Sequence, residues 1–363
     1  MLSVLTFLIV LSVLIIVHEL GHFIFAKKFG VRVETFSLGF GNKLFGIKYK
    51  DTEYRVSSIP LGGYVKMAGE TPYDEAKTGA KYEFVSKPAL QRAIVLSAGP
   101  AFNYCLGFLL FLFVFVAGNP QVTTLVGGVM DKYPAKASGI QSGDRITELN
   151  GKSVHYWDQI IDVVHNTTQG SVSLKVNRGG KEFSLTLTPK VKEFKNIFGQ
   201  GVKIGLLGVA PSNEIKYVKY NPIEAAKLAA QKTWVLTSLT YVSLWRMVTG
   251  AMSFKESVTG PIGIFMVTSK AAYAGIMYVL SLMAILSISL AIFNLLPIPI
   301  LDGGHLFFLI IEKIRGKVVS EKVYELFTQI GLAFLVVLMV FVVYNDAMKA
   351  GWVDKIIGLF IHK

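Results

Sequence analysis

Four long apolar segments, separated by polar stretches, dominate the hydropathy pattern of this chain. They cover residues 1–28, 93–117, 261–304 and 326–346. A helix needs about 20 apolar residues to cross the ~30 Å hydrocarbon core of a bilayer. The pattern therefore predicts an α-helical polytopic membrane protein with four transmembrane helices.

The third apolar segment is longer than one straight span requires. Residues 271–301 carry no charge, and Pro297 and Pro299 lie near their end, just before Asp302. Two prolines remove amide donors and break a helix, here near residue 296. Irregular backbone at membrane depth is tolerated only when protein buries it or when it lines a wet cavity. We therefore expect a broken segment that lines a cavity containing Asp302.

The stretches between the apolar segments differ in character. Alternating polar and larger residues punctuated by glycines predict short strands or a hairpin within a longer cytoplasmic segment. An Asn-Pro-Ile-Glu start predicts an amphipathic helix that lies on the membrane surface. The expected divisions are residues 29–92 (β region and loop), 118–192 (an inserted α+β domain), 193–260 (linker and interfacial helix), 305–325 (cytoplasmic loop) and 347–363 (tail).

Composition and charge agree with a membrane protein. The 363 residues are 52% hydrophobic and 17% charged, whereas soluble globular chains carry about 25% charged residues. The net charge of +13 comes from basic residues spread along loops, which favours contact with anionic headgroups over nucleic acid. Cys105 is the single cysteine, so no disulfide within the chain and no cysteine-based metal site can form.

The distribution of basic residues also predicts an orientation. Residues 27–92 hold twelve Lys or Arg against seven Asp or Glu. Basic loops accumulate on the cytoplasmic side of a membrane, so this stretch should be cytoplasmic and the N-terminus external. The domain at 118–192 then lies outside the cytoplasm.

The motif His18-Glu19-Leu20-Gly21-His22 lies inside the first apolar segment. Residues i and i+4 share one face of a helix, so both imidazoles can bind one zinc ion while the carboxylate between them activates water. The alternative to a zinc site is that two unrelated histidines lie near a helix end. Ionisable side chains at membrane depth are costly and mark function, which favours the zinc site.

Topology brings a third ligand to the same depth. The first span ends in the cytoplasm just past His22, and the third span returns to that side at Asp302. Two histidines and a carboxylate, with the fourth position open, make a catalytic zinc site. Glu19 is the expected general base and Asn294 a substrate contact, while His305 is a rival third ligand. Asn103 is either a packing residue or a substrate contact.

The domain at 118–192 carries the pattern Gly143-Asp144-Arg145-Ile146 followed by Asn150-Gly151. With its strand and helix spacing, it resembles a circularly permuted bacterial PDZ domain. The resemblance implies a peptide-binding loop at Val126, Gly127, Gly128 and Val129. Such a domain either binds a peptide as an added strand or acts as a size filter, and the sequence leaves both open.

Taken together, H-E-L-G-H, S-L-G-F-G, I-P-L-G-G-Y-V-K-M, A-G-P-A-F-N, T-G-P-I-G and N-L-L-P-I-P-I-L-D-G-G resemble the bacterial site-2 proteases of the RseP type. The resemblance implies an enzyme of the bacterial inner membrane, with its active site toward the cytoplasm and one Zn²⁺ held by His18, His22 and Asp302. It implies single-span substrates such as anti-sigma factors or signal-peptide remnants, first cut by an upstream site-1-type protease. It also implies that residues 39–67 form a membrane-associated β-hairpin that presents the substrate as an added strand, with contacts at Gly39, Phe40, Gly41, Leu61, Gly62 and Gly63.

Two other functions remain as alternatives. A non-catalytic PDZ membrane scaffold would be expected to have lost Glu19 or a ligand, and none is missing. A metal carrier would carry polar residues along a continuous path, whereas the spans show one cluster.

Overall fold

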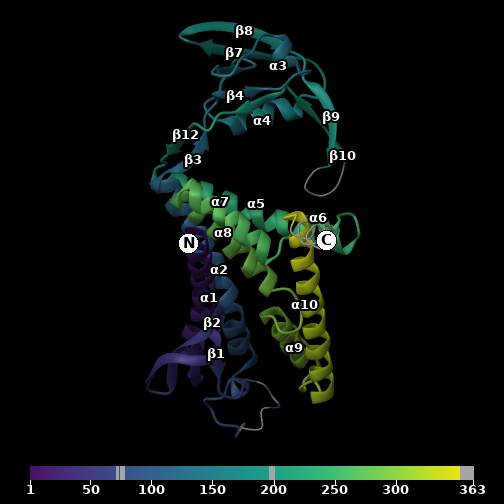
Figure 1. Cartoon of the computed structure of the whole chain (residues 1–363). Coiled ribbons are helices and arrows are strands. Elements are labelled where there is room, and N and C mark those ends of the chain that lie inside the picture. Colours follow the sequence, from purple (N-terminus) through teal and green to yellow (C-terminus); the bar gives the residue numbers. More distant parts are fainter. Residues whose placement is uncertain (71–72, 74–77, 196–200, 352–363) are drawn as a thin grey trace, which may run out of the picture. The chain divides into compact units, whose positions relative to one another are not determined.

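The computed structural model describes residues 1–70, 73, 78–195 and 201–351, which fall into two compact units (Figure 1). The helical unit comprises Met1–Val114, Ile223–Tyr241 and Val258–Lys363. The β-rich unit comprises Phe115–Pro222 and Val242–Ser257. The predicted tail at 347–363 lies outside the described residues from 352 onward.

Long apolar helices make up most of the helical unit. Among the described residues, four helices are long and apolar enough to cross a membrane, as the hydropathy pattern predicts: α1 (Leu2–Lys28), α2 (Ala89–Ala117), α8 (Ile276–Asn294) and α10 (Glu321–Lys349). The other helical elements are a short 3-10 turn, η1 (Phe84–Ser86), and the helices α7 (Pro261–Ala274), α9 (Asp302–Arg315) and α5 (Pro222–Val248), of which the unit includes residues 223–241.

Helix α1 carries the H-E-x-x-H motif and contacts α7, α8 and the two strands that follow it in the chain. Val10 and Leu14 are buried against Val279 and Met283 of α8. The helix ends after Lys27 and Lys28, whose charges interact favourably with the carbonyl end of the helix dipole. This packing fixes the face that presents the two histidines.

Helix α2 begins at Ala89, four residues before the apolar run that predicted it. The extra turn contains Arg92, whose guanidinium donates to both carboxylate oxygens of Glu312 on α9, at 3.1 and 2.7 Å. A paired arginine can enter a helix that hydropathy alone would start later. The contact ties the start of α2 to α9.

The third apolar segment is divided by two breaks. Gly275, at φ +124°, separates α7 from α8, and α8 ends at Asn294 ahead of the two prolines, as their positions predict. Residues 295–301 form a non-helical turn that leads directly into α9 at Asp302. A Cβ on Gly331 of α10 would lie 2.1 Å from Cβ of Pro299, so only glycine lets α10 pack against this turn.

The stretch 305–325, expected as a loop, is mostly helical. Helix α9 runs to Arg315 and ends at Gly316, which is in the left-handed conformation. Its aromatic face explains the helix: the Phe308 ring lies 4.7 Å from that of Phe327 on α10. Sequence reasoning weighed the charges at the end of this stretch and missed its apolar face.

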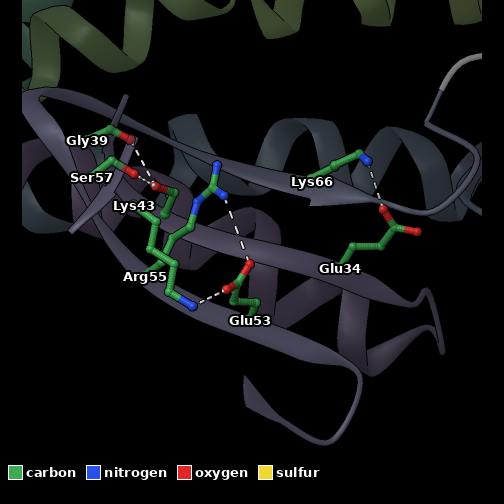
Figure 2. Close-up of polar contacts among 8 residues, drawn as sticks. Glu34, Gly39, Lys43, Glu53, Arg55, Ser57 and Lys66 are labelled. Carbon is green, nitrogen blue, oxygen red and sulfur yellow. Dashed lines mark hydrogen bonds and ion pairs between the residues drawn. The ribbon is translucent and has the colours of Figure 1, made fainter. Parts of the chain in front are cut away.

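Residues 33–67 form a long hairpin of β1 (Val33–Tyr49) and β2 (Thr52–Met67). The hairpin folds back on itself, so its segments pair in the order 43–49, 52–57, 33–38, 63–67. Segment 63–67 is therefore an edge that pairs with no other strand of the described chain. Figure 2 shows the polar contacts that hold the far part, where Lys43 and Arg55 flank Glu53. The hydrogen bond from Lys43 lowers the pKa of Glu53.

The β-rich unit is built around its own core. Its four-stranded sheet has the order β6–β5–β7–β8, and α4 packs beside it (Figure 1). Its elements are β3 (Asn119–Val122), β4 (Val126–Val129), α3 (Pro134–Ala137), β5 (Arg145–Leu149), β6 (Lys152–Ser153), α4 (Trp157–Asn166), β7 (Val172–Arg178), β8 (Lys181–Leu187), β9 (Lys190–Lys195), β10 (Gly201–Leu206), β11 (Val209–Pro211), β12 (Ile215–Val218) and α6 (Phe254–Ser257).

The β-rich unit extends past residue 192, where the sequence placed the start of a linker. Strand β11 pairs with β4, β12 pairs with β3, and Leu207 between them is buried in the core. These late strands are short and partly polar, so their local pattern does not reveal that they close the fold. Residues 207–218 of the expected linker are thus part of the folded unit.

The Gly-Asp-Arg-Ile pattern has a structural role in this unit. The Asp144 carboxylate is 1% exposed and accepts hydrogen bonds from Arg178 Nε at 2.6 Å and from the backbone N–H of Gln141. The guanidinium holds the pKa of Asp144 below its ordinary value. A buried charge that is paired and hydrogen-bonded in this way fixes the turn that precedes β5.

Candidate active site

Three side chains from distant parts of the chain converge on one point in the helical unit. His18 Nε2 lies 3.2 Å from Asp302 Oδ2, and His22 Nε2 lies 3.4 Å from Asp302 Oδ1. The two Nε2 atoms are 3.2 Å apart. Among the described His, Cys, Asp and Glu residues, these three form a group whose ligand atoms all lie within 4.8 Å of one another. The three residues that the predicted topology brings to one membrane depth therefore do lie close together in the structure.

The cluster opens into a cavity of about 270 Å³. Glu19 and Val65 both line this cavity. Val65 belongs to edge segment 63–67, and a Cβ added to Gly63 of that segment would lie 3.4 Å from Glu19 Cγ, so the edge lies beside Glu19. Tyr64 and Met67 of the same segment also line the cavity. The hairpin thus places a free strand edge beside the carboxylate of the motif.

Helix α2 supplies a polar partner to each histidine. His22 Nδ1 donates to the backbone carbonyl of Val95 at 2.8 Å, which leaves the Nε2 lone pair free. The Asn103 amide lies 3.3 Å from His18 Nδ1, and its Oδ1 has no partner among the described residues. With the amide turned so that Oδ1 faces the ring, it accepts the Nδ1–H and leaves Nε2 of His18 free as well.

Gly99 makes this arrangement possible. A Cβ at this position would lie 2.2 Å from His22 Nε2, so any larger residue would displace the ring. Sequence reasoning left Asn103 as either a packing residue or a substrate contact, and it gave Gly99 no role at the histidines. The signal that could have revealed more was a glycine and an asparagine on one helix at the depth of two histidines.

Of the other predicted site residues, some line the cavity and others lie along the hairpin. Asn294 and His305 line the cavity, but His305 is outside the three-residue cluster, and its Nδ1 lies 3.4 Å from the Tyr324 hydroxyl. Gly63 lies beside Glu19, whose Cγ would be 3.4 Å from an added Cβ. Phe40 stacks on Tyr64, with ring centroids 6.0 Å apart. Gly39, Gly41 and Gly62 lie along the hairpin near these residues, and the side chain of Leu61 is outside the described part of the structure.

The predicted peptide-binding loop of the β-rich unit does not line its groove. Val126 is buried in the core, while Gly127, Gly128 and Val129 belong to β4, which pairs with β11. The groove lies between α4 and residues 206–209 instead. The missed signal was the run Gly205-Leu206-Leu207-Gly208-Val209, which the sequence analysis assigned to a linker.

Comparisons with known proteins agree with this site. The family model of peptidase family M50 matches residues 6–338. The chain belongs to peptidase family M50. A protein of Campylobacter jejuni named as a zinc metalloprotease is 36% identical over 96% of this chain and 93% of its own length. The regulator of sigma-E protease RseP of Escherichia coli is 31% identical over 94% of this chain and 97% of its own length.

A solved structure also matches part of this M50 peptidase. The PDZ domain of an SdrC-like protein from Listeria monocytogenes is 22% identical and covers 26% of this chain and 88% of its own. Its TM-score of 0.19 is too low to bear on the fold of the β-rich unit.

The cluster of this M50 peptidase fits a divalent metal such as zinc. Three electron-pair donors point at one another at 3.2–3.4 Å, which is repulsive between neutral imidazoles and a carboxylate unless a cation or protons lie between them. Two imidazoles and one carboxylate form a ligand set common at catalytic zinc sites. The partners on α2 leave both Nε2 atoms available. The residues therefore suit the ion that the sequence predicts.

Replacing Asn103 with Leu should weaken zinc retention by ~10- to 100-fold, because His18 loses the partner that fixes its tautomer. Asn103→Asp keeps an acceptor and should retain zinc. The measurement is zinc content after dialysis against graded chelator. Ser287→Ala is the matched control, since Ser287 donates at 2.7 Å to the backbone carbonyl of Asn103 and not to the histidine. Equal zinc retention in Asn103→Leu and Ser287→Ala would contradict this role.

Proposed function

We propose that this chain is an intramembrane zinc endopeptidase that hydrolyses peptide bonds of single-span membrane proteins. Within that class, anti-sigma factors and signal-peptide remnants are the proposed substrates, cut after an upstream site-1-type protease. The observation that carries the proposal is the meeting of His18, His22 and Asp302 beside Glu19, within helices apolar enough to cross a membrane. A scaffold without catalysis has no need of this cluster.

The proposed roles follow from position. His18, His22 and Asp302 would hold one Zn²⁺ per chain. When bound, the ion supplies a Lewis acid that polarises a carbonyl and lowers the pKa of water. The Glu19 carboxylate accepts a proton from water and later donates it to the nitrogen of the leaving amine. Asn294, which shares the cavity, donates from its amide to the substrate backbone.

The substrate is proposed to bind along edge segment 63–67. A helical backbone shields its carbonyls in hydrogen bonds, so a transmembrane substrate must unwind before hydrolysis. Adding it as a strand to a free edge replaces the lost hydrogen bonds. Tyr64 and Val65 line the same cavity as Glu19, which supports a strand position next to the proposed general base. This role extends the predicted glycine contacts to Tyr64 and Val65.

The proposed setting is the bacterial cytoplasmic membrane, with the β-rich unit outside and the active site toward the cytoplasm. The excess of basic residues in 27–92 supports this orientation. At the far end of the hairpin, Leu44, Phe45, Ile47 and Tyr49 are each more than 60% exposed. Apolar and basic side chains together suit the headgroup region of a lipid bilayer.

Cleavage of a purified single-span substrate in detergent tests the proposal. We expect cleavage by the parent protein, loss of cleavage after chelation, and recovery when zinc is added back. Magnesium added in place of zinc should not restore activity, because histidine ligands favour zinc. Cleavage that persists in a chelated sample shown to be free of zinc would contradict the proposal.

A further inference from the structure

The β-rich unit has an apolar groove of about 330 Å³ with no described segment of the chain inside it. One wall is α4, with Trp157, Ile160, Ile161 and Val164, and the other is residues 206–209. Phe194 and Ile161 are 46% and 36% exposed at its mouth. A groove between a helix and a strand suits an extended peptide with apolar side chains.

One end of this groove adjoins a cluster of positive charge. Tyr133 lines the groove and also a second, shallower hollow whose lining includes Lys132, Lys136 and Lys190. The ammonium groups of Lys190 and Lys192 lie 5.4 and 5.3 Å from the centroid of the Tyr133 ring. Tyr133 therefore stands between an apolar wall and two cations.

The two cations have no anionic partner within the described chain. Lys190 and Lys192 are two residues apart on β9, so both side chains point to the same face. Lys136 has Asp131 at 3.7 Å, whereas neither Lys190 nor Lys192 forms an ion pair with a described residue. Like charges held on one ring repel each other, and an added carboxylate would relieve that repulsion.

We propose that the groove binds an extended peptide whose apolar side chains fill it and whose acidic residues, next to the apolar stretch, reach past Tyr133 to Lys190 and Lys192. This inference rests on the proposed function, because the peptide would be the external end of a membrane-protein substrate. The adjoining apolar groove favours a peptide over a lipid surface, which would need only the charge. The lysines thereby select among apolar peptides those with Asp or Glu at the flank.

Binding of fluorescent 12-residue peptides to the full-length Glu19→Gln protein in detergent tests this inference. One peptide pair carries Glu-Asp-Glu before or after a Val-Ile-Val-Leu core, and the matched pair carries Gln-Asn-Gln. We expect the acidic peptides to bind about tenfold more tightly at low salt. Lys190→Glu with Lys192→Glu should remove that difference, and Ile161→Asp should abolish binding of both peptide classes.

Lys152→Glu with Lys181→Glu is the matched control, because it changes the net charge equally on exposed strands elsewhere in the unit. It should leave the tenfold preference intact. Equal affinity for acidic and amide peptides in the parent background would overturn the inference. So would binding of anionic vesicles, but of no peptide, through Lys190 and Lys192. Neither result depends on cleavage, so failure here is distinct from failure of the proposed protease.

Discussion

Glu19→Gln abolishes peptide-bond hydrolysis and leaves zinc bound, if the account of the site is correct. Glutamine is isosteric with glutamate but cannot accept a proton from water. General-base catalysis contributes roughly 10²–10⁴-fold, so the cleavage rate should fall by about 10³-fold or more. Zinc content should equal that of the parent, because Glu19 is not in the ligand cluster. The measurement is the initial cleavage rate of a single-span substrate, with zinc content determined on the same sample.

Glu70→Gln is the control for this variant. Glu70 is a second carboxylate that lines the same cavity, but it lies on the loop after β2 and outside the H-E-x-x-H motif. Its replacement should reduce the rate by less than about tenfold, which separates the loss of a specific base from a general change in cavity charge. Cleavage by Glu19→Gln at the parent rate would remove Glu19 from the mechanism.

Asp302→Asn is expected to lose both zinc and activity. The amide keeps the shape of the carboxylate but carries no charge and binds zinc poorly, so zinc affinity should fall by more than ~100-fold. His305→Ala should keep its zinc, since His305 is outside the cluster and next to Tyr324. Zinc stoichiometry after passage over a chelating resin measures both variants.

The pair of variants decides between the two candidate third ligands. Retained zinc in Asp302→Asn together with lost zinc in His305→Ala would assign the third ligand to His305. Helix content by circular dichroism should match that of the parent in both, because neither side chain belongs to a buried apolar cluster. A fall in helix content would instead show that the substitution unfolds α9, which begins at Asp302.

The ligand cluster could be anticipated because each of its parts has a local signal. The i, i+4 spacing of His18 and His22 requires one helix face, and the charge pattern of the loops assigns the spans their directions. Pro297 and Pro299 mark the break that brings Asp302 back to the same depth. Each inference uses neighbouring residues or the bilayer thickness, and none of the three depends on long-range packing.

The parts that the sequence did not reveal depend on contacts between distant elements. Gly99, on another helix, leaves the space that the His22 ring occupies. Arg92, in the extra turn at the start of α2, forms an ion pair with Glu312 on α9. Strands β11 and β12 are short, so their local pattern does not show that they close the β-rich unit onto β4 and β3. The groove at 206–209 was missed for the same reason, because a strand edge becomes a wall only when α4 lies beside it.

The central claim is that one metal ion lies between α1 and the first residue of α9, Asp302. X-ray data collected from crystals on both sides of the zinc absorption edge test it most directly. We predict one anomalous peak about 2.0–2.2 Å from His18 Nε2, from His22 Nε2 and from an oxygen of Asp302. A peak bound elsewhere, or a peak at the histidines with the Asp302 carboxylate turned away from it, would contradict the claim.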